Sequence, residues 1–106
     1  MPRFVFVVQT DPVDGRDREY NQWYDEIHLK DVCAFPGFVG ARRFRLVEGE
    51  AKTRYLAIYE LETDDPQRDI AALTAAAGTD RMRMSDALDL SKASTALFEQ
   101  ITEYAR

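Results

Sequence analysis

Tyr24, His28 and Asp31 are the residues of this 106-residue chain whose types and spacing best fit catalysis. His28 is the only histidine, and imidazole is the side chain that exchanges protons most readily near neutral pH. Residues three or four apart on a helix are neighbours, which would set Tyr24 and Asp31 beside His28. The set could hold a phenol or enol substrate, with Asp31 fixing the imidazole tautomer. In the alternative interpretation, His28 only stacks on aromatic residues at the core edge and Asp31 caps the following turn.

Aromatic residues near this set could bind a substrate. Trp23 and Tyr24 lie on the apolar face of the expected helix, where aromatic residues most often form core, but a buried phenol such as Tyr24 also needs a polar partner. Tyr55 and Tyr59 share a strand face with Ala57. The small side chain of Ala57 could leave space between the two tyrosines for a flat ligand, or the tyrosines could belong to a dimer interface. The candidate substrate-binding residues are Tyr59, Trp23, Phe6 and Phe38.

Two neighbouring arginines must point to opposite faces of an expected strand. One of Arg42 and Arg43 therefore points toward a buried face and needs an anionic partner. An ion pair with Glu60, Glu62 or a partner subunit is the simpler interpretation, and a substrate carboxylate is the alternative. Cys33 is the only cysteine, and we expect it to be an inert small hydrophobe. With one cysteine, one histidine and no nucleotide-binding motif, we expect neither a metal nor a cofactor.

The elements that would position these residues follow the order βαββαβ. Apolar and β-branched runs predict strands over 3–9, 38–47, 54–62 and 92–103, with a C-terminal helix as the alternative for the last. Helical spacing predicts a helix over 18–32, and Asp65 and Pro66 begin a second helix that ends at Ala77 before Gly78. This order predicts one α+β domain over 1–106, with a ferredoxin-like four-stranded antiparallel sheet and two helices on one face.

Composition and charge narrow the class of protein. The net charge of −5 disfavours nucleic acid, and no apolar run reaches the roughly 18 residues that a membrane span needs. We therefore expect a soluble cytoplasmic protein with neither a nucleic-acid nor a membrane partner. The run FVFVV is apolar on both sides of its strand, so the sheet face without helices also needs cover. We expect a homodimer formed through these sheet faces.

Residues 3–62 resemble the dimeric α/β barrel superfamily, nearest its EthD-like group, and the remainder fits by topology. The matching motifs are Trp23-Tyr24 with His28 four residues later, then Pro36-Gly37-Phe38 and Arg42-Arg43. The resemblance implies a ferredoxin-like domain in a dimeric barrel. It leaves the activity open, because the superfamily includes cofactor-free monooxygenases, cyclases, decarboxylases, lyases and haem enzymes.

We expect a cofactor-free enzyme that uses acid–base chemistry on a small aromatic, polyketide-like or hydrophobic carbonyl compound, as a lyase, isomerase, cyclase or decarboxylase. The pocket would lie between helices and sheet, with His28 as base or acid, Tyr24 and Tyr59 at the developing oxyanion and Asp31 orienting the imidazole. The alternatives are a cofactor-free monooxygenase and a non-catalytic small-molecule binding protein of a catabolic pathway. Haem binding through His28 is a third alternative. It is disfavoured because the sequence has neither a second histidine nor a lysine cluster that would bind the haem propionates.

Overall fold

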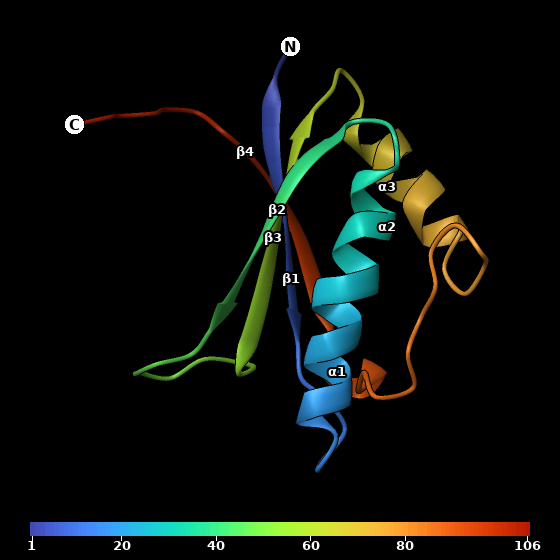
Figure 1. Ribbon diagram of the computed structural model, residues 1–106. Helices are drawn as coiled ribbons and strands as arrows, with labels where there is room; N and C mark the ends of the chain where they lie inside the picture. Colours follow the sequence, from blue (N-terminus) through green and yellow to red (C-terminus); the bar gives the residue numbers. More distant parts are fainter.

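The computed structural model describes all 106 residues and confirms the ferredoxin-like α+β fold (Figure 1). Its four strands form one antiparallel sheet in the order β2-β3-β1-β4. The strands are β1 (Arg3–Thr10), β2 (Phe38–Arg45), β3 (Tyr55–Glu62) and β4 (Ser94–Glu99). Helices lie on one face of the sheet, as Figure 1 shows, and leave the other face bare.

The predicted first helix is continuous but has three parts. It begins as α1 (Asp17–Trp23), widens into a π-helical turn η1 (Tyr24–His28) and ends as α2 (Leu29–Cys33). The second predicted helix is α3 (Pro66–Ala75), where the Asp65 carboxylate accepts a hydrogen bond from the Arg68 amide as expected of an N-cap. A short 3₁₀ turn, η2 (Leu90–Lys92), precedes β4.

The fourth strand is shorter than predicted, and the alternative of a C-terminal helix is wrong. β4 pairs only with β1, and its ladder ends where β1 begins, with a last hydrogen bond from the Gln100 amide to the Arg3 carbonyl. Residues 100–106 have no neighbouring strand beyond that point and form no regular structure. Similarly, β2 ends at Arg45 because its partner β3 begins at Tyr55.

The core lies between the sheet and the helices. The sheet contributes Phe6, Ala57 and Leu61 among others, and the first helix packs Tyr20, Trp23 and other aromatic residues against them. Tyr55 and Tyr59 also face the helices, so the interpretation of these two residues as dimer-interface aromatics is wrong. The opposite sheet face, here called the outer face, carries an apolar group of side chains beside polar ones such as the Arg42–Glu60 pair; the apolar group is Val5, Val7, Phe44, Leu56, Ile58 and Phe98. No helix combines the length and apolarity needed to cross a membrane.

Candidate functional site

The π-helical turn places the two aromatic neighbours of His28. Successive residues of an α-helix are about 100° apart, so residues five apart would point in clearly different directions. The wider turn over Tyr24–His28 instead lets Trp23 and His28 stack, with ring centroids 4.4 Å apart and planes 24° apart. Tyr24 meets the same imidazole edge-on at 5.0 Å. Single π turns inside helices frequently mark functional sites, and nothing in the sequence pattern indicated this one.

His28 is buried, and one of its ring nitrogens has no hydrogen-bond partner. Its side chain lies among Trp23, Tyr24 and Tyr59, the residue is 8% exposed, and the imidazole Nδ1 has no hydrogen-bond partner. Burial lowers the pKa of His28 to about 4; the charge of Asp31 opposes this shift and that of Arg43 adds to it. The imidazole is therefore neutral at pH 7 and can accept a proton or a hydrogen bond.

Tyr59 supplies a second unpaired polar atom in the same cluster. Its hydroxyl is buried without a hydrogen-bond partner, and its ring centroid lies 6.4 Å from that of His28. Burial first, and then the neighbouring Tyr24, raise the pKa of Tyr59 far above its ordinary value, so the phenol stays protonated and can donate. A buried polar group without a partner costs about 1–3 kcal/mol. Two of them in one aromatic cluster suggest a site that a ligand completes.

Arg43 is the positive charge of this cluster. Its side chain is 13% exposed, its guanidinium lies 4.3 Å from the ring centroid of Tyr24, and it donates to Asp25 Oδ1 and Asn21 Oδ1, both at 2.8 Å. Arg42 points to the outer face, where it pairs with Glu60 at 3.1 Å. Arg42 thus makes an ion pair with Glu60 at the exposed face, whereas the prediction concerned the arginine that faces the core. Arg43 is the one that faces the core, and its partner, Asp25, was not among those expected.

Asp31 does not orient the imidazole. Its carboxylate accepts three hydrogen bonds from Arg83, from the amide at 3.0 Å, Nε at 3.0 Å and Nη2 at 2.7 Å. The side-chain bonds to Arg83 are the main cause of the low pKa of Asp31. No hydrogen bond joins Asp31 to His28, and the Asp31 side chain caps no turn, so both expectations for its carboxylate are wrong.

Arg83 belongs to a cover segment, residues 79–89, that runs across the first helix without regular structure of its own. Trp23 Nε1 donates to the Arg83 carbonyl at 3.1 Å, and Arg16 binds Asp86 at 2.8 Å. Together with the hydrogen bonds from Arg83 to the Asp31 carboxylate, these contacts hold the cover segment beside the Trp23–His28 stack. Sequence reasoning missed Arg83, because an arginine in a polar loop gives no signal of its partner.

A cleft of about 490 Å³ opens between the first helix and the sheet, where the pocket was expected, but Asn21, Asp25 and Tyr55 line it and His28 does not. Around Tyr59 the core is closely packed, since the ring centroids of Phe6 and Phe38 each lie 6.3 Å from that of Tyr59. The larger clefts lie at the surface, and none of them is lined by His28. Another cleft of about 490 Å³ lies between the first helix and the cover segment, with Trp23, Ile27 and Met84 in its wall. Trp23 therefore separates His28 from this cleft.

Comparisons with known proteins support the same fold. No protein-family model and no curated protein matches the chain. Among solved structures, the haem degrader MhuD of Mycobacterium tuberculosis, with two haems bound in its active site, is 25% identical with a TM-score of 0.68, over 96% of this chain and 99% of that one. A candidate monooxygenase of Shewanella loihica PV-4 is 14% identical with a TM-score of 0.62, over 97% and 99%. An EthD family protein of Bacillus halodurans C-125 is 16% identical with a TM-score of 0.61, over 95% and 100%.

Proposed function

We propose that this chain, which has the dimeric α/β barrel fold and an EthD family protein among its structural neighbours, is a cofactor-free monooxygenase of small electron-rich phenols. The observation that carries the proposal is the pair of unpaired buried atoms, His28 Nδ1 and Tyr59 Oη, in one aromatic cluster. The similarity to a haem degrader and to a candidate monooxygenase favours oxygenation over the expected lyase, isomerase, cyclase or decarboxylase chemistry.

Each of the two unpaired atoms has a role toward a phenol. The neutral His28 Nδ1 accepts the phenolic proton, while the Tyr59 hydroxyl donates a hydrogen bond to the substrate oxygen. Arg43, on the far side of the Tyr24 ring, contributes a positive charge that favours the phenolate. An electron-rich phenolate is the form of such a substrate that reacts with O₂.

The reaction balances without a cofactor. The phenol loses its O–H hydrogen and one ring C–H hydrogen, and the ring becomes a quinone. One atom of O₂ becomes the new quinone carbonyl oxygen, and the other leaves as water with the two hydrogens. The substrate itself supplies all four electrons that reduce O₂, so no reductant is needed.

The surface cleft beside Trp23 gives the substrate its path. Its volume of about 490 Å³ falls within the roughly 300–1,000 Å³ typical of small-molecule sites. Trp23 forms part of its wall and stacks on His28 from the other side. Rotation of Trp23, with loss of its hydrogen bond to the Arg83 carbonyl, would open the cleft to Nδ1.

Haem binding through His28 is not part of the proposal. Trp23 and Tyr24 pack against the imidazole, and none of the surface clefts is lined by His28, so the structure shows no open face beside the ring for a porphyrin.

A non-catalytic small-molecule binding protein is the second candidate, and one observation favours it. A His28 pKa of about 4 makes the imidazole a weak base, whereas general bases work best with a pKa near the operating pH. A binding protein would use the same two unpaired atoms without proton transfer.

A second copy of the chain is the proposed partner. The outer face exposes Phe44 and Phe98 and carries the side chains of Val7 and Ile58. A sheet face of this composition is more apolar than a monomer normally leaves in water. Two copies that pack their outer faces together bury it on both sides, in an isologous dimer.

The test combines binding and turnover on one panel of phenols with one to three fused rings. Binding is followed under argon by the NMR signals of the single histidine, and turnover by O₂ uptake with quinone absorbance. We expect one quinone per O₂ consumed, one ¹⁸O atom from ¹⁸O₂ in the quinone, and loss of both binding and turnover in Tyr59→Phe. Binding that moves the His28 signals without O₂ uptake supports the binding protein instead. Ligands that leave the His28 signals unchanged overturn both candidates.

A further inference from the structure

We propose that residues 100–106, here called the arm, bind a second copy of this chain in a groove at the tip of its β2–β3 hairpin. The inference rests on the proposed dimer through the outer faces and adds the contact that would lock it. It assigns an occupant to the groove and a binding surface to Ile101 and Tyr104, the two large apolar side chains of the arm that are exposed in the single chain.

The arm leaves the sheet after Gln100 and borders its own outer face at one cleft of about 260 Å³, which Gln100 and Glu103 line together with Arg42 and Glu60. After the hydrogen bond from the Gln100 amide to the Arg3 carbonyl, no further backbone bond holds it. Ile101 is 90% exposed and Tyr104 is 88% exposed, although both are large apolar residues. Figure 1 shows the arm extending away from the sheet on the side opposite the helices. An extended segment with such side chains is suited to binding another surface.

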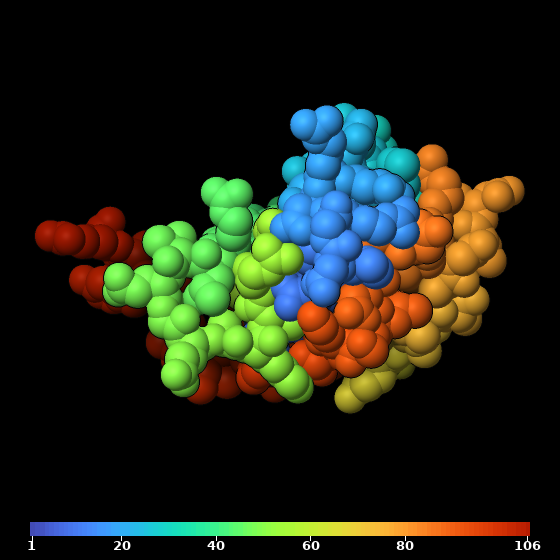
Figure 2. Space-filling model, turned by 90° about the horizontal axis from the view of Figure 1, so that it is seen from below, coloured from blue at the N-terminus to red at the C-terminus, as the bar shows by residue number.

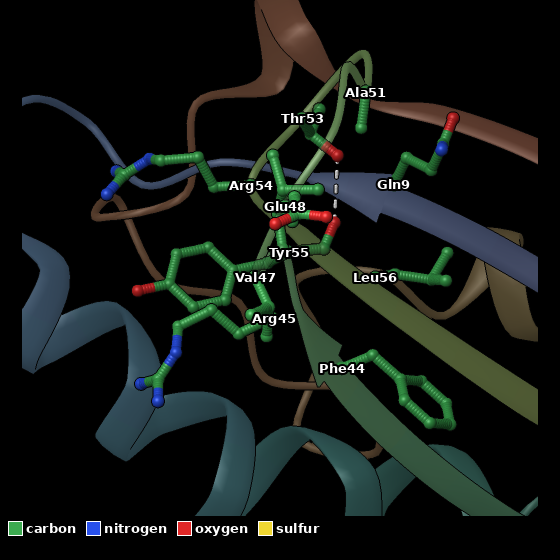
Figure 3. Close-up of a pocket in the computed structure, with 11 residues that line it drawn as sticks. Gln9, Phe44, Arg45, Val47, Glu48, Ala51, Thr53, Arg54, Tyr55 and Leu56 are labelled. Carbon is green, nitrogen blue, oxygen red and sulfur yellow. Dashed lines mark hydrogen bonds between the residues drawn. The ribbon is translucent and has the colours of Figure 1, made fainter.

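The hairpin groove is the matching apolar surface. It has a volume of about 430 Å³, and Figure 3 shows Phe44, Val47 and Leu56 among the residues that line it. Val47 is 94% exposed in the single chain. Phe44 and Leu56 belong to the outer face, so the groove continues the surface through which the second copy would bind.

The arm and the groove lie at opposite ends of the sheet. The arm follows the end of β4, which pairs with the beginning of β1, whereas the groove surrounds the turn between β2 and β3. Figures 1 and 2 show that the arm and the hairpin both project to the side of the outer face. A two-fold axis that sets the outer faces together with strands reversed brings each arm to the partner's groove. Both contacts then form at once, as an isologous dimer requires.

The length of the arm agrees with this contact. Seven extended residues span up to roughly 23–25 Å, comparable with the length of an eight-residue strand. Ile101 and Tyr104 are the large apolar residues of the arm that would fill the apolar part of the groove.

Disulfide trapping tests where the arm binds. Cys33→Ala removes the native thiol, and Val47→Cys with Tyr104→Cys places one thiol in the groove and one on the arm. We expect a covalent dimer on non-reducing gels under mild oxidation, with each single-cysteine variant as a control. Leu90→Cys with Tyr104→Cys is the matched control, since Leu90 is also exposed but lies in η2, outside the groove. Trapping at Leu90 rather than Val47 overturns the proposed docking.

Sedimentation of a chain that ends at Gln100 separates this inference from the dimer itself. We expect the intact protein to sediment at twice the 12.2 kDa chain mass, and the shortened one to dissociate at concentrations at least tenfold higher. A monomeric intact protein overturns both the dimer and the arm contact. A dimer that is equally stable without residues 101–106 overturns the arm contact alone.

Discussion

Trp23 and His28 stack with ring centroids 4.4 Å apart although five residues separate them along one helix. The π-helical turn over Tyr24–His28 makes this contact possible, and Tyr24 closes the other edge of the imidazole. The chain has one tryptophan and one histidine, so the stack joins two unique spectroscopic probes. Its geometry explains why the imidazole is neutral and why its Nδ1 is free for a ligand.

Tyr59→Phe should stabilise the protein while it abolishes phenol binding. The substitution removes a buried hydroxyl that has no partner, so we expect the free energy of unfolding to rise by about 1 kcal/mol in urea. Tyr20→Phe is the matched control, because the Tyr20 hydroxyl is bonded to Thr10 at 2.6 Å. That variant should lose about 1 kcal/mol and keep its ligand affinity. Equal destabilisation by both substitutions would mean that Tyr59 has a partner in solution.

The stability of the protein should fall between pH 6.5 and about 4 because of His28. Its pKa is lower in the folded state than in the unfolded chain, so the unfolded chain binds the proton first as the pH decreases. The free energy of unfolding should drop by roughly 3 kcal/mol across this window. His28→Phe should remove that decrease. The depressed pKa of Asp31 acts separately, since its contribution is lost only below about 3.8.

Asp31→Asn should loosen the cover segment without unfolding the domain. The asparagine side chain has no negative charge and cannot accept all three hydrogen bonds that Arg83 donates to the Asp31 carboxylate. We therefore expect faster hydrogen exchange over residues 79–86 and a loss of about 1–2 kcal/mol in the free energy of unfolding. The pKa of His28, measured by NMR, should fall further below its ordinary value, because the charge of Asp31 opposes the effect of burial. A rise of that pKa would contradict this assignment.

Arg43→Met should lower turnover more than stability. Methionine keeps much of the apolar contact with the tyrosine rings but removes the charge, and Asp25 is mostly solvated and tolerates the loss of its partner. We expect kcat to fall at least tenfold for a phenol substrate and the free energy of unfolding to fall by about 1–2 kcal/mol. Arg42→Met, which removes the neighbouring charge on the outer face, is the control and should leave kcat unchanged. Equal effects of the two substitutions on kcat would contradict the role of Arg43.

Local patterns in the sequence were sufficient for the order of elements. Asp65 and Pro66 begin α3 through a hydrogen bond and a fixed dihedral angle that involve only their neighbours. The aromatic face of the first helix and the alternation in β3 likewise follow from periodicity. The same reasoning found Tyr24, His28 and Tyr59, because few residues of these types share the expected core.

The contacts of the site depended on tertiary structure. The partner of Asp31 is Arg83, 52 residues later in a segment without periodicity, and no local pattern connects the two. The π turn is also invisible to periodicity, since one extra residue in a helix changes the spacing only where it occurs. The close packing around Tyr59 likewise depends on Phe6 and Phe38, which come from two other strands and each place a ring beside it.

The sequence pattern could not predict which of Arg42 and Arg43 faces the core. Alternation required one of them to face the core, but not which one. The register of β2 shifts between Phe38 and Gly40, so that Phe38 pairs with Leu61 and Gly40 with Glu60. This irregularity reverses the alternation, and Arg43 rather than Arg42 shares the helix-facing side with Phe38. The sequence determined that a buried arginine must exist, whereas strand pairing decided its identity, because one unpaired residue exchanges the two faces of a strand.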